Sequence, residues 1–241
     1  MEGREPPRRE VVIPGDLLDG HGLKPGSGTF NEGGHIYAAR VGIRSEKEGY
    51  VDVIPLGGVY IPRARDVVIG KVTDTGPSHW LVDINSPYPA PLHATETPWR
   101  VEFGDTERYL RVGDVILAEV LSVDETKHLQ LSMMEREFGR LKGGQIVEMS
   151  HAKVPRLIGR RGSMVSMIRD FTRVRMFVGQ NGQIWLDGEP EDVRHTVHVI
   201  RMIEERALLT GLTDAVRAYL EGVYGRRASE PAEREASDGR Y

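Results

Sequence analysis

The feature that most constrains this fold is a pair of arginines bracketed by glycines, residues 159–162, which read Gly-Arg-Arg-Gly. Apolar residues lie on both sides of the tetrapeptide. Downstream, Met164, Val165 and Ile168 repeat at helical spacing, which predicts a helix that begins directly after the second glycine. Ser163 is the expected N-cap of that helix. The segment therefore predicts a tight turn that opens onto a helix N-terminus.

Such a turn suits an anion. Free backbone N–H groups and the positive end of the helix dipole favour negative charge, and glycine lets another backbone approach closely. Two guanidinium groups at the apex suit phosphate oxygens. Residues 151–175 carry seven basic residues and one acidic residue, a local charge of +6 in a chain whose net charge is −4. This distribution indicates a polyanionic partner, although a plain helical corner with solvated arginines is the alternative.

The tetrapeptide and its surroundings resemble the GXXG loop of a KH domain, which clamps the backbone of single-stranded nucleic acid. A linker is expected over 138–144 and the KH domain over 145–224. The expected order is strand, helix, loop, helix, strand, strand, helix, with one extra helix. The elements that flank the loop are strands at 145–150, 174–178 and 183–186, a long helix at 189–209 and the extra helix at 212–224. The turn at 179–182 carries hairpin chemistry.

Residues 63–137 are predicted to form a second β unit, whose five strands suit an OB barrel. The strand at 115–124 is apolar in both phases. The unit also resembles the RNA-binding domain named after ribosomal protein S1. The residues that carry this resemblance, in chain order, are Gly70-Lys71-Val72, Gly76 with Trp80, Leu92-His93, Val112-Gly113-Asp114 and Leu131-Ser132-Met133.

The beginning of the chain is predicted to be a β-rich module over 11–62, with strands at 35–43, 50–55 and 59–61. A flexible arm is expected over 1–10 and a disordered tail over 225–241. The predicted fold class is thus mainly β, with an α+β C-terminal domain.

Composition excludes several classes of function. The chain has no cysteine, so disulfides, thiolate metal sites and cysteine nucleophiles are absent. No signal peptide or membrane span is evident, and we expect a cytoplasmic protein. No P-loop, HExxH motif or nucleophile elbow is present, so we expect neither a metal, a cofactor nor catalysis. Asp83, His79 and His93 are the only group we consider as a hydrolytic alternative.

The order of the three modules resembles the KH-containing RNA-binding cap subunit of the archaeal exosome, the ribosomal RNA-processing protein 4 family. Residues 12–16 and Tyr60-Ile61-Pro62 also look like that family's signatures, although Arg65 stands where a glycine is expected. The resemblance implies that three copies sit on a hexameric ring of phosphorolytic ribonuclease subunits. Residues 11–62 would dock to the ring. The chain would capture single-stranded RNA for 3′-to-5′ degradation and processing without cutting it.

The candidate RNA-binding residues fall into a loop group and a barrel group. The loop group comprises Gly159, Arg160, Arg161 and Gly162 as the clamp, with Lys153, Arg156 and Arg169 as supporting charges. The barrel group comprises Lys71, His79, Trp80 and His93 on the binding face, with Arg108 and Arg111 near a pore. For Trp80 the alternative is a core side chain, for His93 a histidine satisfied by backbone, and for the last two arginines a solvated surface.

Two other functions compete with this interpretation. One is a protein-interaction scaffold whose KH domain no longer binds RNA. The other is a free-standing S1/KH RNA-binding factor that acts in translation or transcription.

Overall fold

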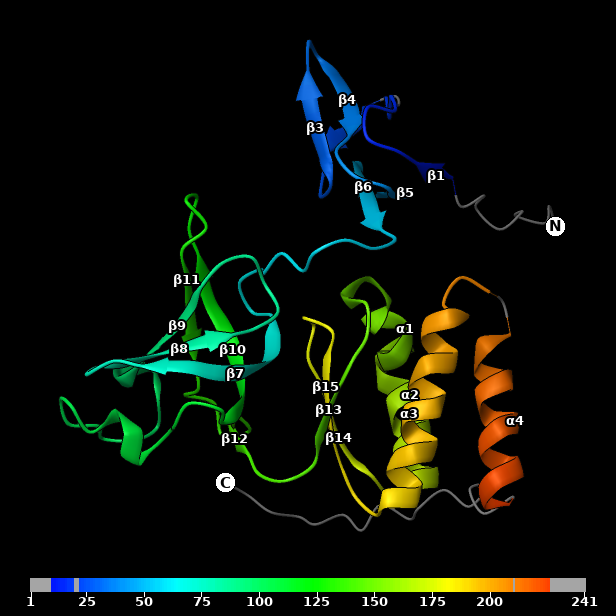
Figure 1. Ribbon diagram of the computed structural model, residues 1–241. Helices are drawn as coiled ribbons and strands as arrows, with labels where there is room; N and C mark the ends of the chain where they lie inside the picture. The colour runs from blue at the N-terminus through cyan, green and yellow to red at the C-terminus, as the bar shows by residue number, and fades with distance from the viewer. Residues whose placement is uncertain (1–9, 20–21, 210, 226–241) are drawn as a thin grey trace, which may run out of the picture.

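Three hydrophobic clusters lie inside three parts of the molecule, and a fourth joins two of those parts. The computed structural model describes residues 10–19, 22–209 and 211–225 (Figure 1). The predicted arm and tail therefore lie outside the described residues, apart from Glu10 and Gly225. In Figure 1 the first part stands above the other two, which lie side by side. The predicted fold class is confirmed.

The first part is a small β module. Its main sheet has the order β1-β5-β6-β2, and β3 and β4 form a separate antiparallel pair. The strands are β1 (Val11–Val12), β2 (Lys24–Pro25), β3 (Thr29–Glu32), β4 (His35–Ala38), β5 (Gly42–Lys47) and β6 (Tyr50–Pro55). Alternation along β6 buries Val51 and Val53 against Leu18 and Ile36. The strand expected at 59–61 is absent. This segment belongs to the connector, residues 56–66, an irregular stretch that joins β6 to the next part of the chain.

The second part is a five-stranded barrel in which β11 pairs with both β9 and β10, so that the sheet closes on itself. The strands are β7 (Val67–Thr75), β8 (His79–Asp83), β9 (Ala90–His93), β10 (Val115–Val123) and β11 (Leu129–Ser132). The segment predicted as a linker contains a further strand, β12 (Gly139–Leu141). It pairs with the first residues of β10, 115–117, while β11 pairs with the later residues of that strand. That pairing makes the linker a continuation of the barrel sheet.

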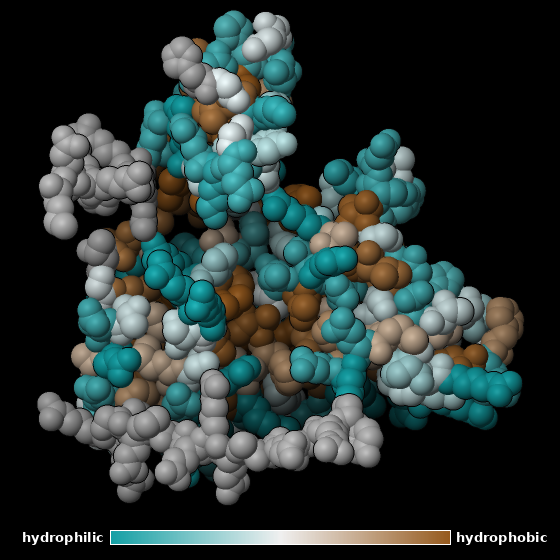
Figure 2. Space-filling model, turned by 180° about the vertical axis from the view of Figure 1, so that it is seen from behind, coloured by the Kyte–Doolittle hydropathy of each residue, from teal (hydrophilic) through white to brown (hydrophobic). Residues whose placement is uncertain are grey.

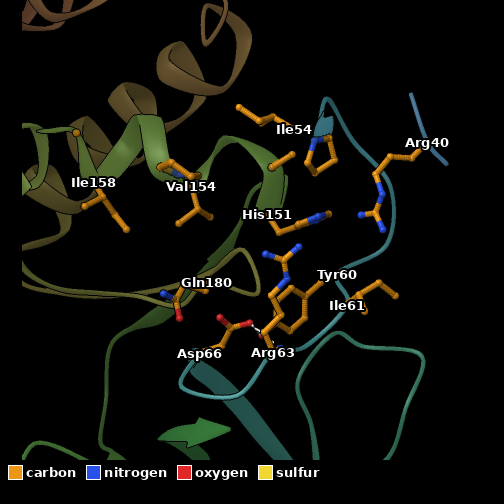
Figure 3. A pocket seen from close by; sticks show the side chains of 14 residues that line it. Arg40, Ile54, Tyr60, Ile61, Arg63, Asp66, His151, Val154, Ile158 and Gln180 are labelled. Carbon is orange, nitrogen blue, oxygen red and sulfur yellow. Dashed lines mark hydrogen bonds between the residues drawn. The ribbon is translucent and has the colours of Figure 1, made fainter. Parts of the chain in front are cut away.

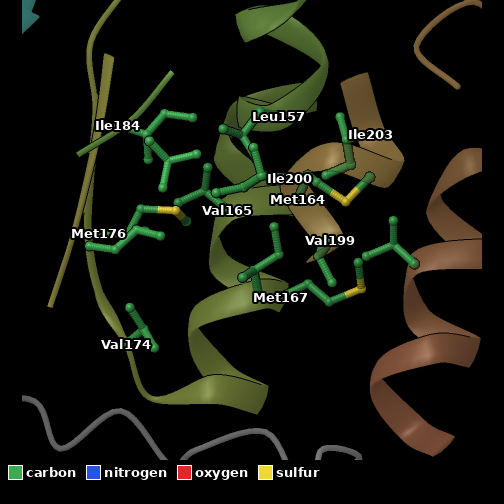
Figure 4. Packing of buried hydrophobic residues seen from close by; sticks show 14 of the residues in the cluster. Leu157, Met164, Val165, Met167, Val174, Met176, Ile184, Val199, Ile200 and Ile203 are labelled. Carbon is green, nitrogen blue, oxygen red and sulfur yellow. The ribbon is translucent and has the colours of Figure 1, made fainter. Parts of the chain in front are cut away.

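The third part has the element order predicted for a KH domain. A three-stranded antiparallel sheet of order β13-β15-β14 is covered on one face by helices (Figure 4). The elements are β13 (Gln145–Glu148), α1 (Val154–Ile158), α2 (Ser163–Thr172), β14 (Arg175–Val178), β15 (Gln183–Asp187), α3 (Pro190–Glu205) and α4 (Leu212–Tyr224). The helix α3 ends at Glu205, before the predicted Leu209, because the chain turns there to reach α4.

The opposite face of this sheet packs on the barrel. Trp185 of β15 contacts a cross-strand pair formed by Ile69 of β7 and Leu117 of β10. Strands β7 and β10 therefore bury both faces, one inside the barrel and the other against β15. This explains why the predicted strand at 115–124 is apolar in both phases. The sheet lies between the barrel and the helices in Figure 1.

Hydrogen bonds from the turn between β14 and β15 complete the joint. The Asn181 side-chain amide is buried and donates to the backbone oxygens of Ile69, at 2.7 Å, and Ile84, at 2.9 Å. The backbone N–H of Gln180 donates to the oxygen of Val67 at 2.8 Å. The hairpin turn predicted at 179–182 is therefore also the attachment point of the third part to the barrel.

We predict that Asn181→Ala destabilises the protein by about 2 kcal/mol, because two buried carbonyl groups lose their side-chain donor. Urea unfolding measures this change. Asn31→Ala, at an exposed position of β3, is the matched control and should leave the unfolding midpoint unchanged. Equal effects of the two substitutions would contradict a role for Asn181 at the joint.

Candidate nucleic-acid interface

The loop 159–162 projects from a buried base. Leu157 of α1 and Met164, Val165 and Ile168 of α2 lie in the hydrophobic cluster beneath it. Arg160 and Arg161, at the apex, are exposed to solvent. The apolar spacing seen in the sequence thus anchors the loop from below while its two charged side chains remain outside.

Backbone geometry explains both glycines. Gly159 has φ 73° and ψ 177°, a region open almost only to glycine, and an added Cβ would lie 2.8 Å from the backbone nitrogen of Met164. Gly162 adopts the left-handed conformation, with φ 79° and ψ 7°, and is the N-cap of α2. The prediction that Ser163 is the cap is wrong. Ser163 is the first helical residue, and no side chain caps α2.

The supporting charges are not all brought to the loop. Arg156 and Arg160 border the same cavity of about 480 Å³, which lies between the loop and the start of α4. Asp214 of α4 also lines this cavity. Lys153 lies at the other end of α1. Arg169 is seven residues along α2 from Gly162, about 10 Å away along the helix axis. Its guanidinium donates to the backbone oxygen of Met176. The structure therefore places Arg156 with the clamp and Arg169 apart from it.

On the barrel, Trp80 is a core residue. Its side chain is fully buried, and its Nε1 donates to the Leu110 oxygen at 3.0 Å. The prediction that Trp80 contributes to an exposed binding face is therefore wrong in this structure. Alternation alone left both assignments open, and only the closed barrel selects the inner one.

His79 and His93 form an outward-facing pair. They are directly opposite on β8 and β9, and their ring centres are 5.8 Å apart. Lys71 is exposed and lies opposite Asp83, at the far end of β8 from His79 and about 13 Å along the strand. Lys71 is therefore separate from the histidine pair. Asp83 is separate for the same reason, so the imagined hydrolytic group of Asp83, His79 and His93 does not converge.

The arginines before β10 are exposed but partly engaged. Arg108 forms an ion pair with Asp105 at 2.7 Å, and the Arg111 Nε donates to the backbone oxygen of Glu107 at 3.4 Å. Both remain on the surface of the loop that leads to β10. Their position agrees with either a solvated surface or a ligand contact.

Phe103 is an aromatic residue that the sequence reasoning missed. Its side chain is 83% exposed, in a loop tied to the β7–β8 turn by a 2.8 Å hydrogen bond from the Gly104 N–H to the Pro77 oxygen. The loop thus ends near the strand that carries His79. The available signal was an aromatic residue followed by glycine between acidic residues.

Neither a metal site nor a membrane-spanning helix is present among the residues that the structure describes. No group of three or more histidine or carboxylate side chains is arranged to hold a metal ion. No helix in the described ranges is long and apolar enough to cross a membrane.

Comparison with known proteins identifies relatives over most of the chain. The family model "Exosome RNA binding protein RRP4 N-terminal domain" matches residues 9–57. Exosome complex component Rrp4 of Picrophilus torridus is 42% identical over 217 residues, which cover 90% of this chain and 94% of the relative. The protein of that name in Methanosarcina barkeri is 44% identical over 225 residues, covering 93% and 86%. A crystal structure described as an exosome complex RNA-binding protein aligns with TM-score 0.62 and 38% identity, covering 68% of this chain and 97% of that one.

We predict that Gly159→Ala destabilises the protein by about 2 kcal/mol or more, because alanine meets both an unfavourable backbone region and the Met164 nitrogen. Gly162→Ala is the comparison. Its Cβ would enter open space, so only the left-handed penalty of about 1 kcal/mol applies. Urea unfolding of both variants measures the difference. A Gly162 variant that is the less stable of the two would contradict this account of the loop.

Proposed function

The chain belongs to the Rrp4 family of exosome complex components, and we propose that it is a non-catalytic RNA-binding cap subunit of that complex. In this role it captures single-stranded RNA and passes it to a phosphorolytic 3′-to-5′ exoribonuclease ring for degradation and processing. The observation that carries the proposal is the loop 159–162, where two exposed arginines stand at the start of α2 on a buried base.

Within the loop, phosphate oxygens would meet donors of two kinds. The N–H of Ser163 already donates to the backbone oxygen of Arg160, and the N–H groups that follow it in the first turn of α2 have no side-chain cap. Arg160 and Arg161 add charge-assisted hydrogen bonds. The absence of a Cβ at Gly162 leaves space for a backbone to approach. These groups bind any RNA sequence, since phosphates carry no base identity.

Bases would contact the barrel. Phe103 offers an exposed ring, and His79 with His93 offers a second flat surface on β8 and β9. Stacking of a base on an aromatic ring contributes about 1–3 kcal/mol and tolerates every base. Arg108 and Arg111 lie on the loop that carries Phe103 and would supply phosphate contacts. Trp80 has no part in this surface.

The first module would attach the chain to the ring. Its edge strand β1 and the residues after it expose Val11, Ile13 and Leu17, each more than half exposed. Apolar side chains grouped at the terminal strand of a sheet favour a protein partner. We propose that this surface docks to the ring, that three copies occupy one ring in the cytoplasm, and that their proximity strengthens RNA capture by effective concentration.

Replacing Arg160 and Arg161 together by Asp should weaken single-stranded RNA binding, because the loop then repels phosphate. The slope of log affinity against log salt should become less negative by about 0.7 for each phosphate that the variant loop no longer neutralises. Fluorescence anisotropy with a labelled oligonucleotide measures both quantities. Arg194→Asp with Arg217→Asp makes the same charge change on exposed positions of α3 and α4. Unchanged affinity and slope in the loop variant would refute the clamp.

Mass determination of the chain mixed with a purified ribonuclease ring should show a complex with three copies per ring. Val11→Glu with Ile13→Glu should abolish this complex, because two charges would enter the docking surface. Val223→Glu, on α4, is the control and should leave the complex intact. A chain that ignores the ring yet binds RNA would instead be the free-standing S1/KH factor.

A further inference from the structure

A cavity of about 410 Å³ lies where the first module, the connector after β6 and the KH domain meet (Figure 3). Its size is within the range of ligand sites, about 300–1,000 Å³. Seen from behind, the surface is hollowed beneath the first module, with apolar side chains inside the hollow and polar ones at its border (Figure 2). The proposed function uses none of the cavity's charged groups.

Two guanidinium groups from outside the KH domain reach this cavity. Arg40 comes from the turn between β4 and β5, and Arg63 comes from the connector. Figure 3 shows both directed toward His151 from different sides. Arg63 donates to the Ser27 hydroxyl. Among the described residues, neither arginine forms an ion pair with a carboxylate. Two unpaired charges that converge on one space favour an anion there.

The one carboxylate in the cavity is already engaged. Asp66 Oδ2 accepts from the Tyr60 hydroxyl at 2.7 Å and from the Arg63 backbone N–H at 3.0 Å. Burial and this carboxylate raise the pKa of Tyr60, so its hydroxyl remains protonated and bonded. Asp66 therefore orders the connector, and the cavity keeps a net positive charge from its two arginines.

His151 is the remaining titratable group. It is half-buried, and its ring lies 5.9 Å from that of Tyr60. Burial, and secondarily the charge of Arg40, lower the pKa of His151 below its usual value. The imidazole is thus held neutral near pH 7, and an anion bound beside Arg40 would favour its protonated form.

The opposite wall is apolar and leads to the GXXG loop. Ile54 of β6 and Val154 and Ile158 of α1 line this apolar side (Figure 3). Pro155 and Gly159 border this cavity and also the one that Arg160 borders. The two cavities are therefore neighbours, with Pro155 and Gly159 between them, so that Arg160 borders one and Arg40 and Arg63 border the other.

We propose that this cavity binds one nucleotide of single-stranded RNA, with its phosphate between Arg40 and Arg63 and its base against Ile54, Val154 and Ile158. The inference rests on the proposed RNA-binding function and extends it to residues outside the KH domain. The cavity exceeds the size of a bare phosphate, and its apolar wall matches the flat face of a base. The first module thus contributes to RNA binding as well as to docking.

The test is anisotropy of a labelled single-stranded oligonucleotide with the full chain. Arg40→Ala with Arg63→Ala should reduce affinity about tenfold or more and make the salt slope less negative by about 0.7, the value for one phosphate. Arg40→Lys with Arg63→Lys should keep the slope. Arg136→Ala with Arg194→Ala removes the same charge at exposed positions outside the cavity and is the matched control.

The outcomes separate this inference from the proposed function. If the Asp variant of the loop weakens binding and the Arg40 and Arg63 variant does not, the cavity proposal is overturned and the RNA-binding function stands. If the wild-type chain binds no RNA, both fall. Should the double alanine variant fail to fold, the single variants Arg40→Ala and Arg63→Ala carry the same test, each with a partial loss. Titration of the wild-type chain with AMP tests for a site that binds free nucleotides instead of RNA. If the wild-type chain binds AMP and the arginine variants keep the wild-type RNA affinity, the proposal is also overturned.

A pH series provides an independent readout. Because a bound phosphate raises the pKa of His151 above its lowered value in the free chain, RNA binding takes up a proton, and affinity should fall as the pH rises through the interval between those two pKa values. Replacing His151 by Gln should remove that part of the pH dependence and leave the part due to other histidines. An identical pH profile in the Gln variant would overturn the placement of the phosphate beside His151.

Discussion

The packing of Trp185 on Ile69 and Leu117, together with the two hydrogen bonds from Asn181, is the contact on which the arrangement of the molecule depends. It holds the KH sheet against the outside of the barrel and so determines where α1 and the GXXG loop face. A buried amide that loses its partners is costly, so this joint has one favourable register. The connector then has a defined path between two fixed parts.

That path brings charges of distant sequence origin together. Arg40, Arg63 and His151 span more than one hundred residues of the chain, yet they surround one cavity next to the GXXG loop. The chain is acidic overall, yet residues 151–175 carry a local charge of +6, and two further arginines border this cavity. Local concentration of charge, rather than net charge, is what directs a polyanion to a site.

The barrel shows how closure assigns roles to residues that a linear pattern leaves ambiguous. Trp80 and His79 are neighbours on β8, and either is a plausible base contact from the sequence. Closing the sheet turns Trp80 inward, where its Nε1 donates a hydrogen bond to the backbone oxygen of Leu110. It turns His79 outward, next to His93. Phe103, in a loop without periodicity, becomes the exposed aromatic residue. Its exposure depends on a loop conformation set by a contact with Pro77.

The sequence by itself determined the element order of the third part, the barrel and the GXXG loop, because periodicity, glycine spacing and apolar anchors are local properties. It also showed that the strand 115–124 is apolar in both phases, and only the structure shows that β15 covers the second face. The end of α3 at Glu205, the additional strand β12 and the cap at Gly162 were decided by packing and backbone geometry. So were the separation of Lys71 and Arg169 from their expected partners, the burial of Trp80 and the meeting of Arg40 with Arg63 and His151. The pairing of β12, the burial of Trp80 and the meeting of Arg40 with Arg63 and His151 depend on contacts between residues far apart in the chain, which no local pattern encodes.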